Sequence, residues 1–306
     1  ANLLDLPFIN TEKDYYSQGY NDALSVGNAQ YLLTGQFSLS YYRYMIGMFF
    51  NKTLFTDLGV EYPYQTVIDG DWDFHKVAEL SANFYKDLNG QGDIDVNDQF
   101  GYVMWAGSGS SLTDGYMASA GLRVVGKDGE NFYVSDLSST ANFSNAIDNI
   151  LKMMYGDGSY TSSTYFDVVG KFTAGTAALT SFRLFLLEET GMKNLGETKQ
   201  GYGILPLPKS DSETQDEYYS YIQDQCLLYA IPRTVGGAKR VESSQFLEAY
   251  ASESYQTVKS AYYERALTTR YAKDPESVRM LEIMESSTFF DPANIYIGTA
   301  FKAFGT

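Results

Sequence analysis

One segment of the sequence carries oxygen-bearing side chains at a spacing that could bind a metal ion. Asp87-Leu-Asn-Gly-Gln-Gly-Asp-Ile-Asp-Val-Asn-Asp98 has the length and order of an EF-hand calcium loop. Gly92 stands where that loop needs its sharp turn, and Ile94 supplies the usual apolar position. Ca²⁺ prefers about six to eight oxygen ligands, which this spacing would place around one point. The predicted ligands are Asp87, Asn89, Gln91, Asp93 through its carbonyl, Asp95 and Asp98.

Two positions of this loop depart from the usual calcium-binding pattern. Gln91 is neutral and longer than the carboxylate usually found there, and Asp98 replaces a bidentate glutamate. Both changes lower the expected affinity, toward the range of about 10⁻⁴ to 10⁻³ M that extracellular modules show. The alternative is a solvated turn of Asn, Asp and Gly residues that binds no metal. A bound Ca²⁺ would hold a surface loop in place and would not act as a sensor.

The elements on either side would position the loop. Residues 71–86 are predicted to form a helix in which Asp73 is the N-cap, and Phe100–Trp105 are predicted to form a strand. The apolar face of the helix is expected to consist of Phe74, Val77, Leu80 and Phe84. His75, the only histidine, falls on the polar side of this helix. A histidine-based metal site or histidine acid–base catalysis is therefore not expected.

Composition narrows the classes of function. The 306 residues favour about two domains. A net charge of −16 would repel nucleic acid and anionic membranes, so neither is an expected partner. Cys226 is the only cysteine, which excludes an internal disulfide and a cysteine-based zinc site, and it is predicted to be buried. The 27 tyrosines offer flat faces with hydroxyl groups, which suit sugar rings and ordinary half-buried surfaces alike.

Two stretches of the chain join a polar, aromatic run to an apolar strand. The first, Ser38–Phe55, passes into Met45–Phe50, which is predicted to be a strand buried on both faces, and then into a short helix closed by Gly59. The second, Tyr218–Pro232, has the same order, with a predicted strand from Cys226. They lie about 180 residues apart in the sequence. Two such strands are what a hinge between two lobes requires.

Hydrophobic periodicity and turn residues predict the remaining elements. Helices are expected at 141–155, 165–174, 183–190, 238–251, 254–263 and 275–286. Strands are expected at 30–34 and 176–182 and a strand with its turn at 201–208, with a hairpin of 122–125 and 131–134 that turns at Gly126–Gly129.

The order of these segments resembles that of the extracellular solute-binding proteins of ABC importers, the maltose-binding-like family 1. The resemblance covers roughly residues 25–300 and rests on several segments together. They are Phe49-Phe-Asn-Lys52 with the following Leu54-Phe55 and Leu58-Gly59, Phe172–Leu179, and Gly201–Pro208. It implies an α/β, two-lobed periplasmic-binding-protein type II-like fold with hinge crossovers.

The same resemblance implies how the chain is divided. Residues 1–43 plus 224–260 would form a partial N-terminal lobe, and residues 44–223 plus 261–306 the C-terminal lobe. Measured against the family, the sequence resembles a fragment without the first part of the N-terminal lobe and without the C-terminal end. The expected protein is an extracellular, cell-surface lipoprotein anchored through the missing N-terminus. It would act as a monomer beside ABC permease subunits.

The function implied by the resemblance is binding, not catalysis. The protein would close by hinge motion over a sugar or oligosaccharide and deliver it to the permease. Tyr and Phe side chains would stack on sugar faces, while Arg and Asp would hydrogen-bond sugar hydroxyls. Each candidate could instead be purely structural. The candidate contacts are Tyr42, Tyr44, Ser108, Ser110, Phe182, Arg183, Tyr221, Gln223 and Asp224.

Two other classes of function stay open on sequence grounds. A glycan-processing enzyme would use paired carboxylates, but no alternating strand–helix rhythm of a barrel is present. A cell-surface carbohydrate adhesion module would suit the acidity and the tyrosine content. Turnover of a glycan would separate an enzyme from a binding protein. Members of the resembled family carry a structural Ca²⁺ in a comparable loop, which favours the metal over the plain turn at Asp87–Asp98.

Overall fold

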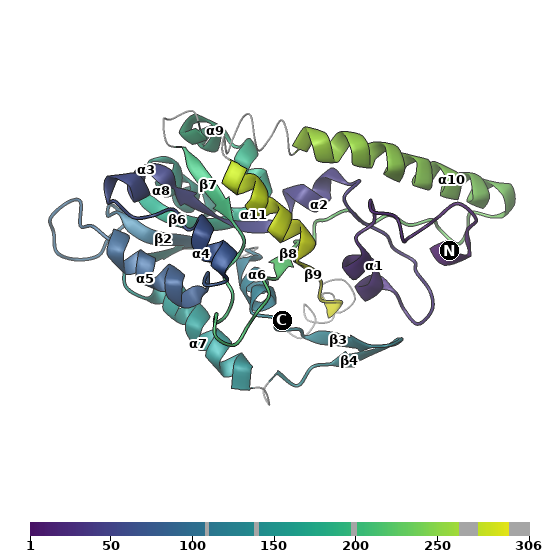
Figure 1. The fold of residues 1–306 in the computed structure, drawn as a ribbon, viewed down its shortest axis with the longest axis horizontal. Coiled ribbons are helices and arrows are strands. Elements are labelled where there is room, and N and C mark those ends of the chain that lie inside the picture. The colour runs from purple at the N-terminus through teal and green to yellow at the C-terminus, as the bar shows by residue number, and fades with distance from the viewer. Residues whose placement is uncertain (108–109, 138–140, 197–200, 263–274, 294–306) are drawn as a thin grey trace.

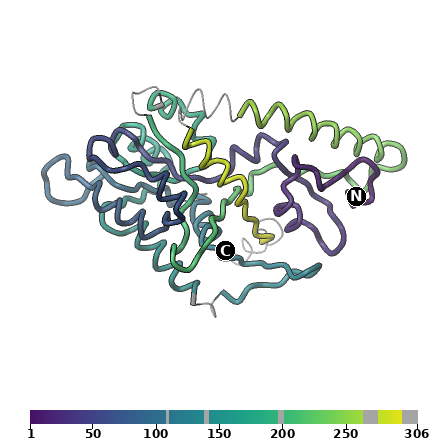
Figure 2. Tube along the Cα trace, viewed as in Figure 1, coloured from purple at the N-terminus to yellow at the C-terminus, as the bar shows by residue number. Residues whose placement is uncertain are grey.

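The computed structural model describes residues 1–107, 110–137, 141–196, 201–262 and 275–293 (Figures 1 and 2). A twisted sheet with helices on both faces occupies one side of the molecule (Figure 1). The N-terminal segments and the long helix α10 (Gly237–Ser254) occupy the other side. Within the described ranges, no helix combines the length and the apolar character needed to cross a membrane.

The sheet has five strands in the order β5-β2-β6-β1-β7. Strand β2 runs parallel to β5 and β6, whereas β1 runs antiparallel to β6 and β7. The carboxyl ends of four strands therefore meet at one edge, together with the start of β1. Every residue of β1 is buried, which confirms the predicted strand with two covered faces. The strands are β1 (Ile46–Asn51), β2 (Phe100–Trp105), β5 (Ser159–Ser162), β6 (Ala177–Arg183) and β7 (Tyr202–Leu205).

Helices cover both faces of the sheet. On one face, α5 (Phe74–Phe84) and α7 (Ala141–Tyr155) pack on each other and on β2. On the other face, α8 (Tyr165–Thr173) contacts β2 and β6, and α9 (Thr190–Gly196) packs beside it. The Asp73 side chain accepts a hydrogen bond from the Lys76 backbone N–H, so the predicted N-cap of α5 is confirmed. The predicted apolar face of α5 is buried.

Shorter elements connect and flank this body. Before the sheet come η1 (Leu3–Asp5), α1 (Gln18–Leu24) and α2 (Leu39–Arg43). Between and after its strands lie α3 (Lys52–Asp57), α4 (Tyr64–Asp69), α6 (Leu112–Ser119), β3 (Val125–Asp128), β4 (Asn131–Val134), η3 (Leu184–Glu188) and β8 (Ser220–Tyr221). Helix α10 continues into a π-helical turn, η4 (Tyr255–Lys259), and later come α11 (Pro275–Ser286) and β9 (Thr288–Phe289).

A separate apolar cluster holds the N-terminal segments against α10. Glu248 on α10 accepts hydrogen bonds from the hydroxyls of Tyr15 and Tyr16, the latter at 2.8 Å. The buried members of the cluster are Leu3, Leu6, Tyr16, Leu33, Phe37, Ile231, Leu247 and Ala251. These residues belong to the two sequence regions assigned above to the N-terminal lobe. The proposed limits of that lobe, 1–43 plus 224–260, stay a prediction.

Two predicted strands are wrong. Residues 30–34 and the run from Cys226 to Ile231 form no strand and meet only in an isolated bridge. Leu33 and Tyr229 exchange two backbone hydrogen bonds of 3.0 and 2.8 Å there. A strand needs a paired neighbour along its length, and in the described residues these two runs exchange backbone hydrogen bonds at that bridge alone. Leu33 and Ile231 are buried in the cluster against α10 instead, whereas Leu227 is 58% exposed.

The hairpin between α6 and α7 turns later than predicted. Asp128 pairs with Asn131, so the turn lies at Gly129-Glu130 and not at Gly126–Gly129. Gly129 has φ +56°, the left-handed conformation that such a turn requires. Gly126 lies inside β3, where a Cβ atom would stand 2.2 Å from the Tyr133 ring. The glycine thus makes room for a cross-strand aromatic side chain and does not form the turn.

Candidate functional site

The edge of the sheet where the strands end gathers the residues with binding chemistry. Strand β2 ends at Trp105, β5 at Ser162 and β6 at Arg183. Arg183 pairs with Ile46 at the start of β1, so the first crossover arrives at the same place. In open α/β sheets, ligands bind outside the carboxyl ends of the strands. This carboxyl edge is therefore the candidate functional site.

Five rings from separate parts of the chain pack together at the carboxyl edge. Trp105 and Phe182 are stacked with ring centroids 6.1 Å apart and an interplanar angle of 27°. Tyr165 lies 5.0 Å from Phe182, and Phe185 lies 5.8 Å from it. Tyr44 meets Phe185 at 6.4 Å. Phe182 is 1% exposed and supports the other four, which are half-buried and can present a ring to a ligand. These five residues are called the aromatic cluster below.

Arg183 joins the aromatic cluster to the return crossover. Its Nη1 donates to Gln223 Oε1 at 2.6 Å and to Gln225 Oε1 at 3.3 Å. The guanidinium also lies over the ring of Phe185, with 4.6 Å between its central carbon and the ring centroid. Burial lowers the pKa of Arg183, although a guanidinium remains charged at any physiological pH. A half-buried cation held by two amides and a ring is positioned to hydrogen-bond a ligand.

The two crossovers run side by side at the carboxyl edge. Met45 and Ile222 form an antiparallel bridge. The Gln223 backbone N–H donates to the Tyr44 carbonyl at 3.0 Å. Farther along, the Leu227 backbone N–H donates to the Ser40 hydroxyl at 2.9 Å. The contacts between the crossovers are thus few and local, which suits a pair of segments that bends as a hinge.

Carboxylates lie beside the return crossover. The pKa of Asp114 on α6 is raised because surrounding protein atoms displace water and because Asp224 is negatively charged. The pKa of the Tyr221 hydroxyl is raised, first by burial and then by Asp114, Asp224 and Asp291. Asp114 and Asp224 are both exposed, so their oxygens can accept hydrogen bonds from a solute. The candidate site thus combines aromatic faces with both signs of charge.

The structure places the predicted contact residues unequally. Arg183, Tyr44 and Asp224 have exposed or half-buried side chains at the carboxyl edge, and Gln223 is buried beneath Arg183. Tyr42, Phe182 and Tyr221 are at most 2% exposed, so in this conformation they pack in the interior. Ser108 lies outside the described residues.

Ser110 has a structural part in the loop after β2. Its hydroxyl donates to the Trp105 carbonyl at 2.7 Å and accepts a hydrogen bond from the Leu112 backbone N–H at 3.3 Å. These bonds tie the end of β2 to the start of α6. Ser110 thereby positions Trp105 and Asp114, which bear the ring and the charge of this region.

Sequence reasoning missed five residues of the carboxyl edge: Trp105, Asp114, Tyr165, Phe185 and Gln225. One usable signal was present, because Trp105 ends a strand that was predicted correctly. Tyr165 and Phe185 gave no such signal. Tyr165 begins α8 and Phe185 follows β6, and only tertiary packing brings these two elements to the same place.

The predicted calcium loop is held by its own hydrogen bonds. The Asp87 carboxylate accepts from the backbone N–H groups of Asn89, Gly90 and Gly92. Asp98 is fully buried and accepts from Leu88 N, Asp95 N and the Tyr85 hydroxyl, at 3.2, 3.0 and 3.0 Å. Within the described ranges, no three His, Cys, Asp or Glu side chains gather as a metal ion needs. The calcium site at this loop stays a prediction.

A lysine already brings positive charge to the end of that loop. The Lys171 ammonium on α8 donates to the carbonyls of Val96 and Asp98. It lies 4.8 Å from the centroid of the Phe100 ring. Burial lowers the pKa of Lys171, and the carboxylates of Asp98, Asp95 and Asp167 act in the opposite direction. The loop is therefore attached to α8 by a protein cation.

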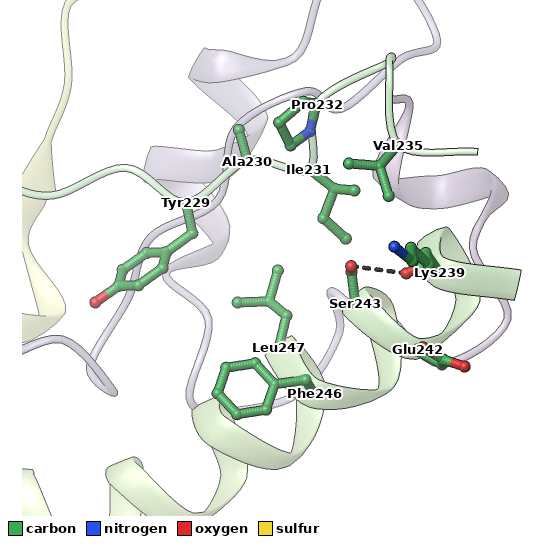
Figure 3. A pocket seen from close by; sticks show the side chains of 10 residues that line it. All are labelled: Tyr229, Ala230, Ile231, Pro232, Val235, Lys239, Glu242, Ser243, Phe246 and Leu247. Atoms are coloured by element: carbon green, nitrogen blue, oxygen red, sulfur yellow. Dashed lines mark hydrogen bonds between the residues drawn. The ribbon is translucent and has the colours of Figure 1, made fainter. Parts of the chain in front are cut away.

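Two hollows lie away from the aromatic cluster. The larger, of about 590 Å³, runs between the end of the return crossover and α10 (Figure 3). Its lining is mainly apolar and comes from one continuous stretch, residues 229–247. Phe246 projects there and is 72% exposed. The smaller, of about 400 Å³, lies between residues 216–219 and the end of α11. Neither hollow brings together the crossovers and the strand ends.

Comparisons with known proteins identify the fold. Neither a protein-family model nor a curated protein sequence matches the chain. Among solved structures, one similar protein is the GacH receptor of Streptomyces glaucescens GLA.O, studied unliganded and in complex with acarbose. It has 16% sequence identity to this chain and a TM-score of 0.58, and the match covers 98% of this chain and 70% of the receptor chain. The maltose/maltodextrin-binding domain MalE from Bdellovibrio bacteriovorus, bound to maltotriose, has 14% identity and a TM-score of 0.54, over 94% and 69%.

A third solved structure agrees with these two. An ABC substrate-binding protein from Listeria monocytogenes, in complex with cycloalternan, has 12% identity and a TM-score of 0.53, over 95% of this chain and 69% of that one. The chain therefore has the two-lobed periplasmic-binding-protein fold of ABC-transporter solute-binding proteins.

Proposed function

We propose that this chain is the solute-binding component of an ABC importer and that it binds a carbohydrate or polyol at the carboxyl edge. The observation that carries the proposal is the aromatic cluster, which lies at the strand ends beside both crossovers. Similarly folded proteins bind acarbose, maltotriose and cycloalternan. Aromatic faces combined with forked charged groups are the chemistry that such hydroxylated rings require.

Each part of the edge has a role in the proposed binding. The half-buried rings of Trp105, Tyr165 and Phe185 would pack against the apolar face of a sugar ring. The Arg183 guanidinium would donate to ligand oxygens, and Asp114 and Asp224 would accept from ligand hydroxyls. Because these groups come from both the sheet and the return crossover, bending at the crossovers would move the carboxylate of Asp224 relative to the rings. Ligand binding would thereby favour the closed arrangement.

The proposal includes the setting in which such a protein works. The protein would be extracellular, a lipoprotein at the cell surface, and a monomer that delivers its ligand to permease subunits. Its strong negative charge is compatible with that setting. A Ca²⁺ ion would hold the Asp87–Asp98 loop and would take no part in ligand binding. Hydrolysis or transfer of the ligand is not expected.

Calorimetry and thermal melting against a panel of saccharides and polyols test the proposal. We expect one-to-one binding without turnover, and a stabilisation of about 2.7 kcal/mol at a hundredfold excess over Kd. Trp105→Ala should abolish binding of the ligand that is found. Tyr155→Ala, which removes a 63% exposed ring on α7, is the matched control and should leave binding unchanged. Release of a shorter glycan would instead favour the processing enzyme, and no binding at all would contradict the proposal.

A further inference from the structure

A polar hollow of about 400 Å³ lies beside the paired strands β8 and β9, between residues 216–219 and the end of α11. Figure 1 shows these two strands between the sheet and the N-terminal segments. Ser220 of β8 donates its backbone N–H to Ser287 O at 2.8 Å. Thr288 of β9 accepts a hydrogen bond from the Tyr41 hydroxyl on α2 at 3.2 Å. One wall of the hollow is thus joined to both crossovers, although no described residue that lines it belongs to the carboxyl edge.

Arg123 lines the polar hollow with a guanidinium that is held from one side only. Its central carbon lies 4.4 Å from the centroid of the Phe289 ring on β9. Phe289 is 4% exposed, and its ring lies 5.2 Å from that of Tyr219, so the support is itself well packed. In the described part of the chain, the N–H groups of Arg123 donate to no other residue and pair with no carboxylate. The planar fork of Arg123 is therefore available for the carboxylate of a ligand.

Two carboxylates line the same hollow. Asp216 and Glu217 are exposed and lie just before β8. Among the described residues neither side chain forms an ion pair, although Arg123 lines the hollow with them. The positive and the negative groups therefore stand apart in one small space. A ligand that carries a carboxylate and an ammonium group would satisfy both signs of charge at once.

Other classes of ligand fit this lining less well. Asp216 and Glu217 would repel phosphate or another simple anion, and Arg123 would repel a metal cation. A neutral ligand would leave charges of both signs without partners. The volume of about 400 Å³ lies within the range of about 300 to 1,000 Å³ that is typical of small-molecule sites. The lining therefore favours a small molecule that carries both signs of charge.

We infer that the polar hollow binds a free amino acid. The carboxylate of the amino acid accepts hydrogen bonds from the Arg123 guanidinium, and its ammonium group lies beside the carboxylates of Asp216 and Glu217. The lining sets one guanidinium against two carboxylates. A basic amino acid, which brings a second cation, therefore binds more tightly than a neutral or an acidic one. This site is separate from the carboxyl edge and does not depend on the proposed function.

Calorimetry with glycine, L-alanine, L-lysine, L-arginine and L-glutamate tests this inference, with acetate and ethylamine as probes that carry one charge each. We expect one-to-one binding that is tightest for L-lysine and L-arginine and much weaker for L-glutamate and the two single-charge probes. Arg123→Gln should raise the Kd of L-lysine about ten- to hundredfold, because it removes a charge-assisted fork. Arg233→Gln, which removes an exposed arginine outside the hollow, is the matched control and should leave this Kd unchanged.

A second variant tests the other end of the site without disturbing the contact between Arg123 and the Phe289 ring. Asp216→Asn combined with Glu217→Gln alters two exposed side chains, so the protein should fold normally. We expect the Kd of L-lysine to rise about tenfold or more and the preference for basic amino acids to disappear. Glu213→Gln, at an exposed position outside the hollow, removes the same kind of charge and should change neither.

The outcomes separate this site from the carboxyl edge. If no amino acid binds the unaltered protein, or if L-lysine binds equally well after Arg123→Gln, the inference is wrong. If Trp105→Ala abolishes the binding of amino acids and Arg123→Gln does not, the amino acid occupies the carboxyl edge, and the inference is overturned. Binding that is lost in Arg123→Gln and kept in Trp105→Ala supports the inference, whatever the saccharide panel shows.

Discussion

Arg183 and Gln223, which lie 40 residues apart in the sequence, are joined by a 2.6 Å hydrogen bond from Arg183 Nη1 to Gln223 Oε1. Arg183 ends β6, whereas Gln223 belongs to the return crossover, so the bond links the sheet to a hinge segment. The same guanidinium lies over Phe185. One side chain therefore couples the aromatic cluster, the crossover and the charge of the candidate site.

Replacement of Arg183 should weaken both the fold and ligand binding. Arg183→Lys keeps the positive charge but loses the planar fork that serves Gln223, Gln225 and the ring of Phe185. We expect the free energy of unfolding to fall by about 1 to 2 kcal/mol and the ligand Kd to rise about tenfold. Urea unfolding and calorimetry measure the two effects. Lys193→Arg on α9, which keeps the same charge away from the cluster, serves as control, and equal behaviour of the two variants would contradict this role.

Asp114 should have opposite effects on stability and on binding. Its pKa is raised in the folded protein, so the folded state disfavours the charged form at any pH above the ordinary value of 3.8. Asp114→Asn removes that penalty at neutral pH, and we expect the melting midpoint to rise by about 1 to 2 °C. Below pH 3.8 the gain should vanish, because the acid is then protonated in both states. Ligand affinity should fall, since the amide accepts fewer hydrogen bonds from hydroxyls.

The buried side chain of Lys52 should make the free energy of unfolding increase with pH above neutrality. Burial lowers its pKa from 10.5 to about 8, so the folded protein disfavours the ammonium form. Stability should therefore increase as the pH rises from about 8 toward 10, up to the point where tyrosines of the unfolded chain begin to ionise. Lys52→Met should remove this pH dependence and stabilise the protein at pH 7 by on the order of 2 kcal/mol. Urea unfolding between pH 7 and 10 checks both; a flat profile for the unaltered protein would argue against a lowered pKa.

Local sequence patterns predicted strands β1, β2, β6 and β7 and helices α5, α7 and α8. Strand β5 was not predicted. The helix predicted at 183–190 was wrong, because Arg183 ends β6, residues 184–188 form the 3₁₀ helix η3, and α9 begins only at Thr190. The apolar run of β1 and the Asp73 cap of α5 depend on neighbours within a few residues, and both predictions are confirmed. The run from Cys226 to Ile231 is equally apolar, yet it is not a strand, because strand formation depends on a partner far away in the sequence. Apolar character predicted the burial of Cys226 correctly but could not predict pairing, and Leu227 beside it is 58% exposed.

The candidate site was less predictable than the fold for the same reason. Trp105, Tyr165 and Phe185 come together only because β2 and β6 are adjacent strands and α8 packs across both. The sequence alone does not contain that order of strands. It also could not distinguish a ring that faces solvent from one that supports it, which is why Phe182 was expected at the surface of the site and lies beneath it.

The loop Asp87–Asp98 offers two substitutions that separate calcium binding from internal hydrogen bonding. Asp98 is buried with three donors, so Asp98→Asn should lower the free energy of unfolding by about 2 kcal/mol with or without Ca²⁺. Asp87→Ala should lower the melting midpoint mainly when Ca²⁺ is present, and neither variant should change ligand affinity. The melting midpoint of each variant and of the unaltered protein, measured with Ca²⁺ and with EDTA, checks both expectations. If the unaltered protein melts at the same temperature with Ca²⁺ and with EDTA, the calcium prediction is wrong.

Lys127 should limit movement of the two lobes away from each other, because its side chain links the hairpin β3–β4 to α1. Its ammonium donates to the Asp22 carbonyl at 2.7 Å and to the Ser25 hydroxyl, both at the carboxyl end of α1, where a cation is favourable. The base of the hairpin is fixed by Asp291, which accepts from Val125 N at 3.1 Å. Lys127→Met should therefore release α1 from the hairpin at a cost of about 0.5 to 1.5 kcal/mol in stability.

The release of α1 should be visible in the shape and the kinetics of the protein. Without ligand, small-angle scattering of Lys127→Met should give a larger radius of gyration than that of the unaltered protein, and ligand should dissociate about two- to tenfold faster. Lys152→Met, at an exposed position of α7 remote from α1, removes the same charge and should change neither quantity. A Lys127→Met variant that loses stability but keeps its radius and its dissociation rate would show that the contact holds the hairpin alone. The two halves would then open about the crossovers without restraint from β3 and β4.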